Sequence, residues 1–386
     1  MRIVYIYHSL AIKGGIERVI INKANYLAEK YDYDVYIITT EQGNNPIVYP
    51  LYKTVKHIDL GIFFYRRYNY SRLKRIKVYW NLRHVYKNKL TELLQSLQAD
   101  ITISTTIEPI DFLPSIPDGS IKIIESHLAK EFTGKQHLYR KKNIIFKFIA
   151  LILDWKFEYI VKKYEALIAL TEKDKKKWDN IIKTVTIPNA LPFYPDTGSL
   201  CQNKKIICAG RLEMEKGYDL LIKVWRIVIQ KHPEWSLHIY GDGSLKNELN
   251  KAISKEGLKN SLIIENPVSD IYNKYIESSI FVMSSRYEGF PMVLLEAKSC
   301  GLPIVSFDCP NGPSDIILNG EDGFLIENRN IEAMAEKICY LIENENIRID
   351  MGKKARENVK RYMPDIIMQK WGDLFNNLIT DKIVKN

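Results

Sequence analysis

The chain lacks the paired cysteines of a disulfide scaffold or a zinc knuckle. Its 386 residues hold five cysteines, which stand far apart and form no CxxC pair. An odd, scattered set of this kind in a long chain is typical of a protein from a reducing compartment. The small, disulfide-stabilised secreted proteins are therefore excluded as a class.

Long apolar runs are also missing, so no segment is expected to cross a bilayer. The best candidate, Ile144 to Leu153, is interrupted by Lys147 and followed at once by Asp154. The first ten residues carry one basic residue and no small-residue cleavage site, which is not the pattern of a secretory signal peptide. We therefore expect a cytoplasmic protein.

Acidic residues are absent between Asp59 and Glu92, where nine bases are interleaved with aromatic residues. A solvated surface helix is one reading, and contact with an anionic partner is the one we favour. Aromatic rings suit a membrane interface, so we expect peripheral attachment to the inner face of the cell membrane. No nucleic-acid-binding motif accompanies the bases, so no nucleic acid partner is expected. The bases proposed for this membrane or acceptor surface are Arg66, Arg67, Arg72, Lys74, Arg75 and Lys77.

What the sequence does contain is a regular alternation of short apolar strands with helical segments, which predicts parallel sheets covered on both faces. The expected strands of the first half are 3–7, 35–39, 101–104, 121–124, 167–170 and 185–187. After a segment rich in proline, 191–203, the pattern restarts. The expected strands of the second half are 205–209, 237–240, 262–264, 280–283 and 304–307.

This organisation predicts an α/β protein of two doubly wound, Rossmann-like domains that face a cleft. The expected division is a first domain at 1–190, a linker at 191–203, a second domain at 204–363 and a final helix at 364–386 that could pack back on the first domain. The length suits two domains of ordinary size.

Two loops between a strand and a helix have the composition of phosphate-binding turns. The first holds Gly14 and Gly15, where the backbone can approach a phosphate beside a helix N-terminus. The second holds Arg211 and Lys216, two cations that suit a diphosphate beyond the carboxyl end of a strand. A plain tight turn and two solvated bases are the respective alternatives.

The strongest motif reads Glu288-Gly289-Phe290-Pro291, with Glu296 on the helix that follows. We expect Pro291 to be the first residue of this helix. A carboxylate such as Glu296, set among apolar residues, needs a partner, and sugar or ribose hydroxyls are suitable donors. The exposed N–H groups at the helix entry suit a hydroxyl or a phosphate oxygen. A helix-entry acid and a surface glutamate are the structural alternative.

These motifs resemble the retaining glycosyltransferases of family 4, which have the GT-B fold. The similarity rests on E-G-F-P-x(4)-E, on the R-x(4)-K of the second cationic loop and on the N-terminal G-G-x-E-R, and it extends over nearly the whole chain. It implies that Arg211 and Lys216 bind the donor diphosphate, and that Gly14 and Gly15 approach the phosphates from the first domain.

The same resemblance implies roles for the residues of the strongest motif. Glu288 would face the transferred sugar, with Gly289, Phe290 and Pro291 beside it, and Glu296 would bind the ribose hydroxyls.

The family also places a histidine after a middle strand of the first domain, which matches His127 here. A surface histidine is the alternative; given the other motifs, we assign His127 and Glu288 to the reaction centre.

No metal or other cofactor is expected. The Asp32-Tyr33-Asp34 sequence has the form of a metal-binding DxD motif, but it precedes a strand and is predicted to be a polar turn. The leaving diphosphate would instead be stabilised by cations and helix N-termini.

The resemblance implies transfer of a hexose or N-acetylhexosamine, with retention, from a nucleoside diphosphate sugar that is expected to be a UDP-sugar. Similar sequences often build bacterial surface polysaccharides, so the expected acceptor is a polyprenyl-diphosphate-linked glycan or lipopolysaccharide. A catalytically silent subunit that binds nucleotide sugar or membrane, and a GT-B sugar-nucleotide epimerase, are the alternatives.

Overall fold

A computed structural model describes residues 1–106, 111–133, 139 and 144–385, and the chain divides into two compact units. The first unit holds Met1–Pro188 together with Ile367–Asn386, and the second holds Asn189–Ile366. The proline-rich segment at 191–203, expected as a linker, is counted with the second unit.

The first unit is built on a parallel sheet with the strand order β3-β2-β1-β4-β5-β6-β7. The strands expected from the apolar runs are confirmed to within two residues at either end, while β3 was missed. Their bounds are β1 (Arg2–Tyr7), β2 (Asp34–Thr39), β3 (Lys56–Asp59), β4 (Ile101–Thr105), β5 (Ile121–Ser126), β6 (Ala166–Ala169) and β7 (Thr184–Thr186).

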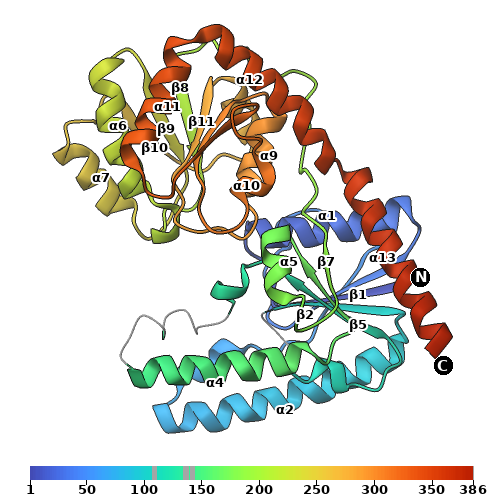
Figure 1. Cartoon of the computed structure of the whole chain (residues 1–386). Coiled ribbons are helices and arrows are strands. Elements are labelled where there is room, and N and C mark those ends of the chain that lie inside the picture. Colours follow the sequence, from blue (N-terminus) through green and yellow to red (C-terminus); the bar gives the residue numbers. More distant parts are fainter. Residues whose placement is uncertain (107–110, 134–138, 140–143, 386) are drawn as a thin grey trace. The chain divides into compact units, whose positions relative to one another are not determined.

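Helices cover both faces of this sheet, as parallel strands require. Figure 1 shows α1 (Gly15–Lys30) on one side and α2 (Arg72–Leu97) with α4 (Ile144–Val161) on the other. Residues of α2, α4 and α5 (Glu172–Trp178) share one hydrophobic core with the strands. The short 3₁₀ turns are η1 (Phe64–Asn69), η2 (Leu113–Ser115) and η3 (Lys130–Phe132).

The second unit repeats the plan with the strand order β10-β9-β8-β11-β12-β13, again parallel. Every strand expected here is present, and β13 was missed. The strands are β8 (Lys205–Ala209), β9 (Ser236–Tyr240), β10 (Leu262–Glu265), β11 (Ile280–Met283), β12 (Ile304–Phe307) and β13 (Gly323–Ile326).

The helical segments of the second unit connect these strands and close its core. They are η4 (Met214–Lys216), α6 (Tyr218–Lys231), α7 (Lys246–Lys255), α8 (Ile271–Ile276), α9 (Met292–Ser299), α10 (Pro313–Ile316), α11 (Ile331–Glu343), α12 (Glu345–Asn358) and η5 (Val359–Tyr362).

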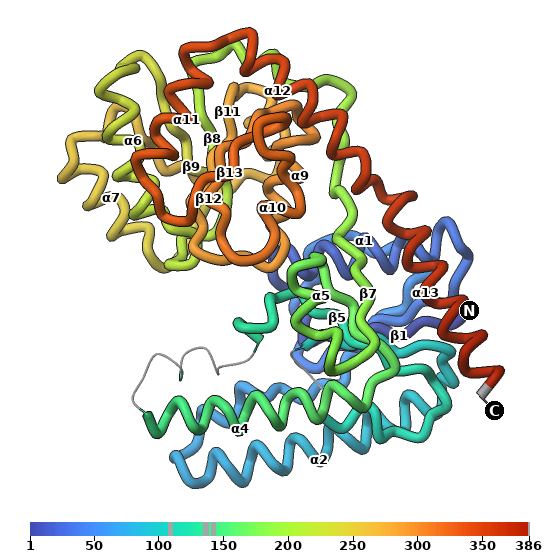
Figure 2. The backbone as a smooth tube through the Cα atoms, in the orientation of Figure 1, coloured from blue at the N-terminus to red at the C-terminus, as the bar shows by residue number. Residues whose placement is uncertain are grey.

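The last helix, α13 (Pro364–Lys385), begins in the second unit and packs on the first, as expected. In Figure 2 this helix is the red end of the tube, which lies beside the strands and helices of the first unit. Trp371 is 2% exposed, and its ring lies 3.9 Å from the Nζ of Lys23 on α1. Cation–π contact and apolar burial therefore both hold the helix in place.

Each sheet has one point where the strand order reverses direction. It lies between β1 and β4 in the first sheet and between β8 and β11 in the second. Open α/β sheets bind ligands beyond the carboxyl ends of the strands at such a point.

Candidate active site

Lys216 and Glu288 meet at the reversal point of the second sheet. Lys216 ends the η4 turn that follows β8, and Glu288 lies in the loop after the neighbouring strand β11. The Nζ of Lys216 is 2.7 Å from Oε1 of Glu288, and their side chains are 20% and 11% exposed. The hydroxyl of Ser285 donates to the same Oε1 at 2.6 Å. A half-buried ion pair with a third hydrogen-bonding group is a strong, pre-ordered contact.

Close backbone approach brings these two loops together. The backbone N–H of Arg286 donates to the carbonyl of Glu215 at 2.7 Å, and the Ser284 hydroxyl donates to the carbonyl of Lys216 at 3.0 Å. Between them Gly217 has φ +66°, and a Cβ at this position would collide with the carbonyl oxygen of Ser284. Only glycine suits both the left-handed backbone and the space.

Arg286 is a residue whose role the sequence analysis missed. Its guanidinium donates to both carboxylate oxygens of Asp219, at 2.8 and 2.6 Å, and to the carbonyl of Met214 at 2.8 Å. The hydrogen bond to Asp219 raises the pKa of Arg286. This forked contact ties the Glu288 loop to η4 and α6.

Arg211 lies on the same loop as Lys216 but is not part of the ion pair. Its side chain is 75% exposed, and Nη2 lies 2.9 Å from Oε1 of Glu215. Of the two predicted cations, Lys216 therefore lies directly against Glu288. Arg211, five residues earlier in the chain, lies at the surface.

The helix entry differs by one residue from the prediction. α9 begins at Met292, and Pro291 is its N-cap residue, with φ −74° and ψ +94°. The Pro291 ring is packed against Gly312, where φ is +98° and a Cβ would collide with the proline Cδ. Close contact with the loop after β12 therefore keeps Pro291 out of the helix.

The Phe290 side chain is buried, and its place beside the sugar stays a prediction. Phe290 is 7% exposed, and its ring lies 5.9 Å from that of Tyr362 in an edge-to-face contact. Burial against another aromatic ring turns this side chain into the core. Gly289, between Glu288 and Phe290, is partly exposed.

Glu296 has the buried setting that the sequence predicted, with a protein group as a partner. It is 4% exposed, and its Oε2 accepts a hydrogen bond from the hydroxyl of Tyr275 on α8 at 3.1 Å. Burial, together with the nearby Glu296 carboxylate, raises the pKa of Tyr275 well above its usual value. Tyr275 therefore remains a donor to Glu296.

In the first unit, Gly14 and Gly15 open α1 as predicted, Gly14 as its N-cap. The side chain of Glu17 folds back over Gly14, and the Tyr7 hydroxyl donates to its Oε1 at 3.0 Å. Nothing lies within 4 Å of a Cβ placed at Gly15. The approachable backbone of this turn is therefore at Gly15.

His127 follows β5 and belongs to a buried charged cluster. Its Nε2 is 3.1 Å from Oε2 of Glu125, at ion-pair distance but without the alignment of a hydrogen bond. Oε1 of Glu125 accepts from the Nζ of Lys23 at 2.6 Å. Burial acts to raise the pKa of Glu125, but Lys23 and His127 outweigh it and lower the pKa to about 2.

Glu125 and Lys23 were not assigned roles from the sequence. The available signal was the position of Lys23 on the otherwise apolar face of α1, because a buried lysine requires an anionic partner.

The bases predicted to form a membrane surface lie on η1 and the start of α2, and several contact aromatic rings of the same segment. The Arg66 guanidinium is 4.4 Å from the centre of the Phe63 ring, Arg67 is 5.1 Å from Tyr79, and Lys74 is 4.7 Å from Tyr70. Arg75 donates to the carbonyl of Tyr70 at 2.8 Å. Arg72 and Lys77 are exposed.

The Asp32-Tyr33-Asp34 sequence lies at the amino end of β2, the opposite sheet edge from Gly15 and His127. Asp34 pairs with Arg2 at 2.7 Å and with Lys56 at 2.9 Å. Within the part of the chain that the structure describes, no group of three or more His, Cys, Asp or Glu residues could hold a metal ion. Independence of metal stays a prediction.

The chain is similar to known glycosyltransferases. A family model for glycosyl transferases group 1 matches residues 196–358. The chain is 31% identical over 366 residues to an uncharacterized glycosyltransferase of Haemophilus influenzae, covering 93% of this chain and 95% of the relative. It is 32% identical over 227 residues to the poly(ribitol-phosphate) alpha-N-acetylglucosaminyltransferase of Staphylococcus aureus, covering 57% of this chain and 46% of that one.

A solved structure shares the fold. A mutant of S. aureus TarM, in complex with fondaparinux, alpha-GlcNAc-glycerol and UDP, has a TM-score of 0.76 over 97% of this chain and 99% of that chain. Because the two sequences are 20% identical, the likeness shows the fold alone.

The loop contact at Gly217 yields a prediction about stability. Gly217→Ala should lower the free energy of unfolding by about 3 kcal/mol, because the new Cβ meets both an unfavourable φ and the Ser284 carbonyl. Gly257→Ala is the matched control, since Gly257 has φ +71° but open space around it. It should cost only about 1 kcal/mol. Equal losses in denaturant unfolding would contradict the close approach.

Proposed function

Because the chain belongs to the glycosyl transferases of group 1 and has the GT-B fold, we propose that it is a retaining, family 4 enzyme that uses a UDP-sugar. It transfers a hexose or N-acetylhexosamine to a lipid-linked or polysaccharide acceptor that is used to build the bacterial cell surface. The transfer takes place on the cytoplasmic side of the membrane. The relatives support this choice, since one is named for adding N-acetylglucosamine to a poly(ribitol-phosphate) and a neighbouring structure contains UDP.

The ion pair between Lys216 and Glu288 carries the proposal. It lies at the reversal point of the second sheet, where α/β folds bind ligands. Negative charge grows on the diphosphate as the bond to the sugar breaks, and a cation held in advance lowers that barrier. Lys216 provides this cation, Glu288 holds it in position, and the hydroxyl of Ser285 donates to Glu288.

The other site residues take roles that fit their surroundings. Glu288 lies next to the diphosphate site and orients the transferred sugar, while Glu296 and Tyr275 form a buried polar pair for the ribose. Exposed Arg211 can turn from Glu215 toward the diphosphate, because a surface pair of this kind is weak. His127 is assigned to the reaction centre, with its Nε2 at ion-pair distance from Glu125.

The alpha linkage in the name of the S. aureus relative supports the proposal of retention. An alpha product formed from an alpha-linked nucleotide sugar keeps the configuration of the anomeric carbon. A separate observation supports the proposed acceptor: the basic and aromatic stretch at 62–90 suits a surface that presents lipid-linked glycans.

The direct test is a donor assay. We expect the protein to release UDP from at least one of UDP-glucose, UDP-galactose, UDP-N-acetylglucosamine and UDP-N-acetylgalactosamine, faster when a lipid-linked saccharide is added. The product should be alpha by NMR, and EDTA should leave the rate unchanged. No UDP release from any of these donors would contradict the donor class, and loss in EDTA restored by manganese would show a metal requirement.

The same assay separates the two alternatives. A silent subunit would bind a UDP-sugar without releasing UDP. A sugar-nucleotide epimerase would change the configuration of the sugar without transferring it to the saccharide.

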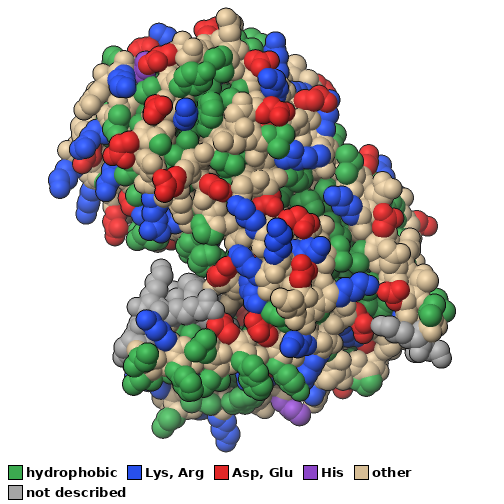
Figure 3. All heavy atoms as spheres, viewed as in Figure 1, with side chains coloured by type: hydrophobic (Ala, Val, Ile, Leu, Met, Phe, Trp, Pro, Cys, Tyr) green, Lys and Arg blue, Asp and Glu red, His purple; other side chains and the backbone are tan. Residues whose placement is uncertain are grey.

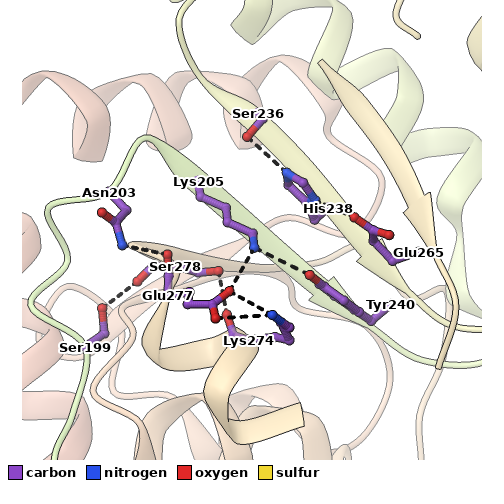
Figure 4. Close-up of polar contacts among 10 residues, drawn as sticks. All are labelled: Ser199, Asn203, Lys205, Ser236, His238, Tyr240, Glu265, Lys274, Glu277 and Ser278. Carbon is purple, nitrogen blue, oxygen red and sulfur yellow. Dashed lines mark hydrogen bonds and ion pairs between the residues drawn. The ribbon is translucent and has the colours of Figure 1, made fainter. Parts of the chain in front are cut away.

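Substitution of the cations tests their role. Lys216→Ala and Arg211→Ala should each lower the rate of transfer about ten- to a thousandfold, as expected for loss of a charged contact to the transition state. The matched control is Lys205→Ala. Lys205 begins β8, is 19% exposed and pairs with Glu277 at 3.5 Å in the polar cluster of Figure 4. Its loss should leave transfer within about twofold; a rate for Lys216→Ala equal to this control would overturn the assignment.

A further inference from the structure

Helix α4 exposes many large apolar side chains to solvent. Ile144, Ile145, Phe148, Leu151 and Trp155 are each 64% exposed or more. Its buried residues are Ala150 and Val161, with a few half-buried side chains between them. Folded monomers seldom leave contiguous apolar surface beyond roughly a few hundred Å² uncovered. A partner that buries α4 is therefore expected.

The charges of α4 are sorted between its two sides. Among the exposed residues of α4, all of which the structure describes, Lys147 and Lys156 are the charged ones and none is acidic. The two acids of the helix, Asp154 and Glu158, are only partly exposed, and Glu158 pairs with Lys130 at 2.8 Å. The outer surface of α4 is thus apolar with a positive charge.

The start of α2 adds to this surface. α2 and α4 both follow the carboxyl ends of strands, cover the same sheet face and contribute to one core. Leu73, Ile76 and Trp80 of α2 are 85%, 59% and 61% exposed. Figure 3 shows hydrophobic side chains gathered over α4 and α2 on the viewed face, with lysine and arginine among them.

We propose that this α2–α4 surface lies in the headgroup region of an anionic membrane, with the apolar side chains of α4 inserted. Bases with no acid between Asp59 and Glu92 suit anionic lipid, and exposed Trp80 and Trp155 suit the boundary between headgroups and acyl chains. Within the described residues, no helix is long and apolar enough to cross a membrane, so α4 lies along the surface.

A second copy of the chain is a less suitable partner for this surface. A symmetric pairing would bring the bases of both copies together in the interface, where like charges repel. Lipid offers the opposite charge. This inference rests on the proposed function, which includes a lipid-linked acceptor. Attachment through the α2–α4 surface would hold the enzyme beside such an acceptor.

The test compares two double variants in vesicle sedimentation. Phe148→Glu/Ile152→Glu places two acids on α4 at positions that are 64% and 50% exposed. Ile383→Glu/Val384→Glu makes the same change on α13 of the same unit, where exposure is 71% and 81%. The parent should bind phosphatidylglycerol–phosphatidylcholine vesicles and not phosphatidylcholine alone. The α4 variant should bind at least tenfold more weakly, and the α13 variant within twofold of the parent.

Three results would overturn the inference. In the first, the parent does not bind anionic vesicles, and in the second, both variants lose vesicle binding equally. In the third, the parent is a dimer that the α4 substitutions convert to a monomer, while vesicle binding is unchanged. Circular dichroism of each variant establishes that it is folded. Hydrolysis of the UDP-sugar, measured without vesicles, should be the same in parent and α4 variant. UDP release without vesicle binding would reject the membrane inference alone, and vesicle binding without UDP release would reject the proposed function alone.

Discussion

The ion pair between Lys216 and Glu288 is the interaction on which the candidate site depends. Two charged side chains that are mostly withdrawn from water persist because each satisfies the other. The contact requires two strand-end loops to touch, and Gly217, Ser284 and Arg286 make that approach possible. Removing one partner leaves the other half-buried and unpaired, which is why a single substitution here affects both geometry and charge.

The first unit uses the same principle in a more deeply buried form. Glu125 joins Lys23 and His127, and Trp371 of α13 covers Lys23. Because α13 is the last helix of the chain, the surroundings of His127 depend on residues more than two hundred positions away in sequence. The C-terminal helix therefore shapes the surroundings of His127 as well as the fold of the first unit.

Much of this arrangement could be predicted from the sequence, since apolar runs fix the inner strands and strand-end loops fix where polar motifs gather. The edge strand β3 was missed because its sequence, KHID, carries charge along its length, and the other missed strand, β13, is an edge strand too. Pro291 lies one residue outside its expected position because tertiary contact with Gly312 decides it. Periodicity also could not show that α4 is exposed, since a helix that is apolar on most sides has no preferred face.

Contacts with aromatic rings order part of the exposed basic stretch. The cationic groups of Arg66, Arg67 and Lys74 lie over neighbouring rings and keep their charge. The exposed apolar side chains of α4 are a separate feature of the same unit. The α2–α4 surface is defined by its positive charge together with its exposed apolar side chains.

The most direct test of the central claim is a crystal structure with UDP bound. The account predicts a diphosphate oxygen about 3 Å from the Nζ of Lys216, with the ribose toward Glu296. UDP bound elsewhere, with the contact between Lys216 and Glu288 unchanged, would contradict it.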